Sequence, residues 1–276
     1  MSECSHDCAS CAQNCNERQT PQNLLEKLNP HARVQKVIAV CSGKGGVGKS
    51  MVTALLAAAA QKKGLNAGVL DADITGPSIP KMFGVHERAT GDQSGIYPVS
   101  SAGGVQLMSL NLLLENETDP VIWRGPLITG TIKQFWTDVL WDDVDILFVD
   151  MPPGTGDSTL TIFQSLPVDG IVFVSTPQEL VGMIVEKAVN MARAMQLPLS
   201  ALVENMSYFT CSDCGKTHEI FGPSRAAQIA QKFHIPVSTR LPLNPDIAAA
   251  ADRGGIEGIS LDALGPVLQQ IEQIKK

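Results

Sequence analysis

A stretch rich in glycine and lysine, residues 43–50, has the clearest chemistry in this sequence. It reads G-K-G-G-V-G-K-S and matches the G-x-x-x-x-G-K-S pattern of loops that bind nucleotide phosphates. In such loops the glycines let backbone N–H groups approach the phosphates, and the helix that follows favours negative charge at its N-terminus. Lys49 would place its charge beside the β- and γ-phosphates, and the Ser50 hydroxyl would hold Mg²⁺. The predicted ATP-binding residues are Gly43, Lys44, Gly45, Gly46, Val47, Gly48, Lys49 and Ser50.

Acidic residues at the ends of two predicted strands would complete this site. The apolar runs 66–71 and 145–150 end in Asp71 and Asp150, and Asp73 follows the first of them. Because ligands bind at the carboxyl ends of parallel strands, these carboxylates are expected near the phosphates. Asp150 would hold the water shell of Mg²⁺, and Asp71 or Asp73 would orient the attacking water or reach the same shell. Helix capping is the alternative for Asp71 and Asp73. Glycines after Asp150 would allow a switch loop that senses the γ-phosphate.

A second chemical feature is the C-x2-C pair formed by Cys211 and Cys214. Two thiolates fill only half of a tetrahedral metal site, and His218 could add a third ligand. Two chains related by a twofold axis would supply four thiols, because a symmetric interface brings the same patch together from both sides. A redox pair or a partial zinc knuckle is the alternative reading of the same residues.

Four further cysteines lie in the first 20 residues, which contain almost no other apolar side chains and cannot fold around a core. They are Cys4, Cys8, Cys11 and Cys15. Four thiols within twelve residues can close one metal site, and part of their spacing is like that of a ferredoxin cluster. Zinc, with His6 as another ligand, and a reducible tail without a metal are the alternatives.

The elements that must position these groups alternate along the chain. Strands are predicted at 34–40, 66–71, 105–110, 145–150, 170–175 and 199–204. Helices are predicted at 51–63, from 123 to about 140, and at 179–195. Strand–helix alternation over such a length is typical of an α/β fold, a doubly wound and mostly parallel sheet flanked by helices. We therefore expect a cysteine-rich tail at 1–20, a linker at 21–33, and one P-loop ATPase domain at 34–276 with the cysteine loop at 211–214.

Composition narrows the classes of partner. The chain has 276 residues and a net charge of −7 without a strongly basic block, which argues against nucleic acid as a partner. No apolar run reaches the roughly 18 residues that a membrane helix needs, and the N-terminus does not resemble a signal peptide. We expect no membrane partner and a cytoplasmic location. The sequence has seven cysteines, and in a cytoplasmic protein these are expected to bind metals or to take part in redox chemistry rather than to form disulfides.

The early lysine of the loop, Lys44, adds a resemblance to a known family. The run K-G-G-V-G-K-S resembles the deviant Walker A loop of P-loop NTPases of the MinD, ParA and nitrogenase iron-protein type. Together with further motifs, the sequence resembles the Mrp/ApbC ATPases, which are iron–sulfur cluster carriers or scaffolds. These further motifs are D-A-D-I-T-G-P-S at 71–78, V-I-W-R-G-P at 121–126, V-D-M-P-P-G-T-G-D at 149–157, E-N-M-S at 204–207 and the C-x2-C at 211–214.

The resemblance implies ATP binding, slow ATP hydrolysis, a homodimer, and transfer of clusters to apo iron–sulfur proteins. It implies a [4Fe–4S] cluster bridged by Cys211 and Cys214 of each subunit. It also implies that Lys44 reaches the nucleotide of the partner, that Asp73 orients the attacking water, and that Asn205 reads the adenine. The N-terminal cysteines depart from the family pattern, so their metal stays open between iron–sulfur and zinc.

Two other functions are compatible with the same loop. A positioning ATPase of the MinD/ParA class would bind a membrane or DNA, but the chain lacks a basic terminal helix. An electron-transfer protein similar to the nitrogenase iron protein would keep its cluster and cycle its redox state with ATP.

Overall fold

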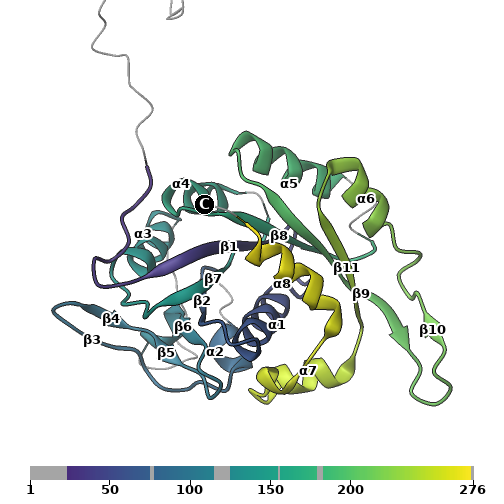
Figure 1. Ribbon diagram of the computed structural model, residues 1–276, viewed down its shortest axis with the longest axis horizontal. Helices are drawn as coiled ribbons and strands as arrows, with labels where there is room; N and C mark the ends of the chain where they lie inside the picture. The colour runs from purple at the N-terminus through teal and green to yellow at the C-terminus, as the bar shows by residue number, and fades with distance from the viewer. Residues whose placement is uncertain (1–23, 75–77, 115–124, 155, 179–182, 275–276) are drawn as a thin grey trace, which may run out of the picture.

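A twisted central sheet organises the computed structural model, which describes residues 24–74, 78–114, 125–154, 156–178 and 183–274 (Figure 1). Within these residues the sheet has nine strands in the order β10-β9-β8-β1-β7-β2-β6-β5, and β11 pairs with β9. Its strands are β1 (Val34–Ser42), β2 (Ala67–Asp71), β5 (Val99–Ser100), β6 (Gln106–Met108), β7 (Val144–Asp150), β8 (Gly170–Ser175), β9 (Leu199–Thr210), β10 (Thr217–His218) and β11 (Val237–Pro242). All pairs are parallel except β5 with β6 and β9 with β10.

Helices cover both faces of the sheet, which explains why its central strands are continuous apolar runs rather than alternating ones. They are α1 (Lys49–Lys62), α2 (Ile79–Met82), α3 (Gly125–Thr137), α4 (Asp157–Ser165), α5 (Met183–Ala194), α6 (Ala226–Phe233), α7 (Pro245–Asp252) and α8 (Gly265–Glu272). Two buried clusters result. Val37 and Ala39 of β1 face the cluster that includes α3, α4, α5 and α6, whereas Ile38 and Val40 face the cluster that includes α1, α2, α7 and α8. The predicted doubly wound fold is confirmed.

Several elements differ in extent from the sequence prediction. Strand β9 continues to Thr210, six residues beyond the predicted end at 204. The strand predicted at 105–110 spans only Gln106–Met108 and gives way to a 3-10 helix at Leu110–Leu112. Residues 84–104 form a small hairpin, β3 (Thr90–Asp92) with β4 (Gly95–Tyr97), and the edge strand β5. Two further 3-10 helices lie at Ile256–Gly258 and Asp262–Leu264.

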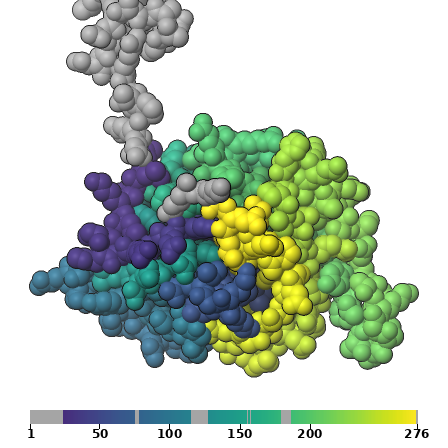
Figure 2. Space-filling model, in the orientation of Figure 1, coloured from purple at the N-terminus to yellow at the C-terminus, as the bar shows by residue number. Residues whose placement is uncertain are grey.

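The extra length of β9 builds an arm. Beyond its pairing with β8, the strand turns back through β10, and this hairpin projects from the rounded body of the molecule (Figures 1 and 2). Cys211 and Cys214 lie in the turn between β9 and β10. The cysteine pair is therefore displayed at a distance from the sheet centre. Among the described residues, no helix combines the length and apolar character needed to cross a membrane.

Candidate functional site

The predicted phosphate loop connects the end of β1 to the first residue of α1. Gly46 and Gly48 adopt left-handed backbone conformations, with φ of 81° and 79°, which glycine reaches without a steric penalty. A Cβ atom on Gly48 would lie 2.3 Å from the Asn205 side-chain nitrogen, so this position also needs glycine for space. The loop lines a pocket of about 280 Å³ together with Asp73, Ser78 and residues of α1 and α2. The geometry fits a loop whose backbone wraps around an anion.

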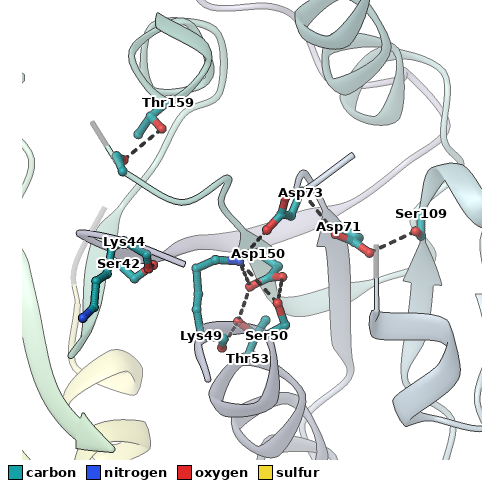
Figure 3. A network of polar contacts seen from close by, with 11 residues as sticks. Ser42, Lys44, Lys49, Ser50, Thr53, Asp71, Asp73, Ser109, Asp150 and Thr159 are labelled. Carbon is teal, nitrogen blue, oxygen red and sulfur yellow. Dashed lines mark hydrogen bonds and ion pairs between the residues drawn. The ribbon is translucent and has the colours of Figure 1, made fainter. Parts of the chain in front are cut away.

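Lys49 and Asp150 form the centre of the polar network beside this loop (Figure 3). Lys49 Nζ lies 2.8 Å from Asp150 Oδ1, and the two side chains are only 6% and 1% exposed. Asp150 also accepts hydrogen bonds from Ser50 Oγ at 2.6 Å and from Thr53 Oγ1 at 2.8 Å. A buried ion pair is stable only when its remaining hydrogen-bonding capacity is used. The two hydroxyls meet that need for the carboxylate.

The strand register explains why residues distant in sequence meet here. Val40 of β1 and Asp71 of β2 are both Cα partners of Asp150 in β7. Asp71 and Asp150 therefore lie side by side at one edge of the sheet, and the loop after β1 lies at the same edge. The sequence prediction did not include Thr53, which lies four residues after Lys49 on the same face of α1 and also donates to the Lys49 carbonyl. A lone threonine in an alanine-rich helix was the available signal.

Asp71 and Asp73 have different surroundings. Asp73 Oδ2 lies 3.7 Å from Lys49 Nζ and faces the pocket. Asp71 is buried, and it accepts hydrogen bonds from Ser109 Oγ at 3.0 Å and from the Asp73 backbone N–H at 3.2 Å. Burial, followed by repulsion from Asp150, raises the pKa of Asp71 to about 8. Asp71 thus holds the backbone of the Asp73 loop through a hydrogen bond, while Asp73 is the acid that lines the pocket.

The loop after β7, predicted as a switch loop, is tied to the phosphate loop on one side and to α4 on the other. The Gly154 N–H donates to the Ser42 carbonyl at 3.0 Å, and Thr159 Oγ1 donates to the Gly154 carbonyl at 3.2 Å (Figure 3). Ser42 in turn donates through Oγ to the Lys44 carbonyl at 2.9 Å, and Lys44 is exposed at the pocket rim. These bonds join the phosphate loop, the loop after β7 and α4.

Asn205 reaches the same loop from β9. Its Nδ2 donates to the Val47 carbonyl at 2.9 Å, and the residue is fully buried. That bond fixes the orientation of the amide, and the Asn205 Oδ1 atom is buried without a hydrogen-bond partner. An unpaired buried acceptor is costly and points to a missing donor. Sequence reasoning placed Asn205 at the nucleotide, and the structure places it beside the loop.

The cysteine pair lies apart from the nucleotide pocket, in the turn of the β9–β10 arm. The turn is closed by the Gly215 N–H, which donates to the Cys211 carbonyl at 2.9 Å, and by the Cys211 N–H, which donates to the Lys216 carbonyl at 3.0 Å. Hydrogen bonds from the Cys214 and Asp213 backbone N–H groups lower the pKa of Cys211. In contrast, burial raises the pKa of Cys41 to about 12. The arm thiols are accessible and suited to metal binding, whereas Cys41 is a core residue.

Other predicted ligands are not brought to this pair. His218 is exposed on β10, and in the described part of the chain no three His, Cys, Asp or Glu side chains are placed to hold a metal ion. Cys211 and Cys214 therefore stand as a two-ligand pair. The N-terminal cysteines at positions 4, 8, 11 and 15 lie outside the described residues.

Comparisons with known proteins agree with this geometry. The model of the NUBPL iron-transfer P-loop NTPases, a ParA-type family, matches residues 33–274. An iron–sulfur cluster carrier protein from Clostridium perfringens is 45% identical over 235 residues, covering 82% of each chain. One from Methanococcus maripaludis is 41% identical over 259 residues, covering 91% of this chain and 89% of the relative.

Two solved structures of nucleotide-binding proteins and ATPases also resemble this chain. A nucleotide-binding protein from Archaeoglobus fulgidus, in complex with ADP, superposes with a TM-score of 0.76 at 40% identity, covering 88% of this chain and 93% of that one. The cell-division ATPase MinD from Pyrococcus furiosus superposes with a TM-score of 0.60 at 18% identity, covering 87% of this chain and 99% of that one. The second likeness concerns the fold alone.

The buried Asp71 predicts a pH dependence of stability. Its pKa is about 8 when folded and about 3.8 as the unperturbed value, so between these pH values the folded chain binds more protons than the unfolded chain. Its contribution to the unfolding free energy is therefore present below pH 3.8 and lost as pH rises through 8. Asp71→Asn removes this loss. We expect the stability of the variant relative to the unsubstituted protein to rise across that window and to level off above it.

Urea unfolding without nucleotide, at a series of pH values, measures this difference. Asp142→Asn is the matched control, because it removes an exposed carboxylate rather than a buried one. A difference for Asp71→Asn that stays flat with pH would contradict the assignment of a raised pKa to Asp71.

Proposed function

The chain belongs to the ParA-type NUBPL family of iron-transfer P-loop NTPases, and we propose that it is an ATP-dependent carrier of iron–sulfur clusters. In this proposal it binds ATP, hydrolyses it slowly and passes clusters to apo iron–sulfur proteins. The observation that supports it most directly is that β9 carries a residue bound to the phosphate loop and leads directly into the turn that holds the accessible cysteine pair. The likeness to MinD gives no specific support for a positioning role, because it concerns the fold alone.

ATP binding would rearrange the Lys49–Asp150 pair. Phosphate oxygens would replace Asp150 as the partner of Lys49 Nζ, and the carboxylate would then be available to a cation. Ser50 Oγ and Asp150 Oδ2 are hard oxygen donors that already lie 2.6 Å apart, a donor set that suits Mg²⁺ and its water shell. When bound, Mg²⁺ would neutralise charge on the phosphates. The orphaned Asn205 Oδ1 fits an amino donor, in keeping with adenine recognition.

Hydrolysis would use the acid that faces the pocket. Asp73 forms an ion pair with Lys49 at 3.7 Å and would orient a water molecule toward the γ-phosphate. Asp71 would hold the Asp73 backbone in place through the hydrogen bond from its N–H. Lys44 lies exposed at the pocket rim, a position from which it would act on the nucleotide of a second subunit.

The cluster would be cargo held between two subunits. Cys211 and Cys214 supply two thiolates, and a [4Fe–4S] cluster takes four, so a homodimer with a twofold axis near the arm turns would complete the site. The lowered pKa of Cys211 favours the thiolate form that binds iron, and the exposure of Cys214 would let a cluster leave. Thiols that must stay reduced suit the cytoplasm.

The N-terminal cysteines would form a second site. We assign Cys4, Cys8, Cys11 and Cys15 to one further cluster or to zinc, held separately from the shared cluster. The segment that follows this tail is anchored to the domain, since the Glu26 N–H donates to the Ser165 carbonyl at 2.8 Å and Lys133 pairs with the Glu26 carboxylate at 2.8 Å.

Replacing Lys49 tests the nucleotide site. Lys49→Met should weaken Mg·ATP binding by about 30-fold or more, equivalent to about 2 kcal/mol, because the buried charge that faces the phosphates is lost. Isothermal titration calorimetry measures the affinity, and a thermal melt checks that the domain stays folded. Lys62→Met, at the exposed end of the same helix, is the matched control and should bind normally. Normal affinity in Lys49→Met would rule out the phosphate-loop assignment.

Replacing the arm cysteines tests the cargo site. The Cys211→Ala, Cys214→Ala double variant should lose the shared cluster, so its iron content after anaerobic reconstitution should fall to the amount held by the N-terminal tail. ATP binding and thermal stability should be nearly unchanged, because the thiols lie in an accessible turn outside the core. Changing the four tail cysteines to serine is the complementary control and should leave the shared cluster. Full iron content in the arm variant would refute the bridging model.

A further inference from the structure

One strand joins the two sites of this molecule. Asn205, bonded to the Val47 carbonyl of the phosphate loop, lies on β9, and Cys211 follows the last residue of that strand. They are six positions apart in the sequence, which corresponds to roughly 20 Å along an extended strand. The backbone of β9 therefore connects the contact at the phosphate loop directly to the arm.

The strand is irregular at this point. Arg240 of β11 pairs with Glu204 and Pro242 pairs with Tyr208, so two steps on β11 lie opposite four on β9. Met206 takes up the excess with a left-handed φ of 53°, an uncommon conformation for a side chain of this size. Three polar residues close together in sequence are all buried at this bulge, namely Glu204, Asn205 and Ser207. Bulges beside functional sites re-aim side chains in this way.

Arg240 holds this bulge and the arm together. Its Nε donates to Ser207 Oγ at 2.6 Å, and its Nη2 donates to Glu219 Oε1 at 2.5 Å, just after β10. The guanidinium also stacks on the Tyr208 ring, 5.4 Å from the centroid. One planar group thus connects the buried part of β9 with the returning limb of the hairpin that displays the cysteines. The fixed fork of a guanidinium permits two such bonds in divergent directions, which an ammonium group on a flexible stem does not reproduce.

The buried carboxylate of Glu204 explains on electrostatic grounds why the Arg240 guanidinium lies beside this bulge. This carboxylate is fully buried, accepts a hydrogen bond from Ser207 Oγ through Oε1, and has no partner for Oε2. Arg240 Nε lies 3.8 Å from Glu204 Oε1 and supplies the nearby positive charge. A buried carboxylate without a compensating charge is strongly unfavourable, so the attraction to Glu204 in the core fixes the position of Arg240. The hydrogen bond from Arg240 to Glu219 then fixes the arm relative to the core.

We propose that Arg240 is a positioning residue that couples the nucleotide state of the phosphate loop to the exposure of Cys211 and Cys214. The inference rests on the proposed function and adds the route by which ATP acts on the cargo site. Movement of Val47 shifts Asn205, the bulge passes the shift to Ser207, and Arg240 turns the arm through Glu219. The variants that test this proposal remove different hydrogen bonds of the Arg240 guanidinium.

The experiment follows alkylation of the metal-free, full-length protein by iodoacetamide, with and without Mg·ADP. Peptide mass spectrometry reads Cys211 and Cys214 separately from the other cysteines. In the unsubstituted protein, Mg·ADP should change their alkylation rate by about fivefold or more, at the lower end of typical coupling between sites. Arg240→Lys keeps a positive charge near Glu204 but loses the fork, and it should abolish most of this change while binding Mg·ADP normally.

Two further variants complete the test. Glu219→Ala breaks only the bond to the arm and leaves the core contacts of Arg240, so it should also lose the nucleotide effect without loss of thermal stability. Arg225→Gln removes an exposed arginine and should keep the full effect. The proposal is overturned if Mg·ADP leaves the unsubstituted alkylation rates unchanged, or if Arg240→Lys and Glu219→Ala both retain the full effect. Because no cluster is present, these outcomes are independent of whether the protein carries one.

Discussion

The buried ion pair between Lys49 and Asp150 is the interaction on which the rest of the structure depends. It joins the start of α1 to the end of β7, and its carboxylate is also held by Ser50 and Thr53. Parallel pairing of β1, β7 and β2 is what brings these groups to one edge of the sheet. In the proposed mechanism the phosphates would compete with Asp150 for the same lysine and would release the carboxylate for a cation.

The second organising feature is the reach of β9. Its first half pairs with β8, the pairing with β11 continues to Tyr208, and its last two residues pair with β10 in the arm that carries the cysteines. A transport function for a labile cargo benefits from this arrangement, since the thiols stay accessible to a partner while the strand remains anchored at the phosphate loop by Asn205. The buried Glu204 and the forked Arg240 give the junction a defined geometry rather than a flexible hinge.

Much of the fold and of the nucleotide site could be predicted from the sequence, because both depend on local patterns. The glycine spacing at 43–50 and the apolar strands that end in Asp71 and Asp150 predict the positions of the loop and of the two carboxylates to within a few residues. The network of Glu204, Ser207 and Arg240 could not be predicted, since it depends on a bulge and on a pairing between β9 and β11 that no local pattern encodes. The support of Asp71 by Ser109 was missed for the same reason, because it joins two separate strand ends.

The central claim is that this protein gives clusters away, and a transfer assay tests it most directly. The reconstituted protein is mixed anaerobically with an apo-ferredoxin in the presence of an iron chelator, and iron is followed on both proteins. We predict that iron leaves this protein and appears on the ferredoxin in matching amounts, unaffected by the chelator, because the cluster passes directly between thiolates. Iron that stays on this protein, or iron that the chelator intercepts, would contradict the account.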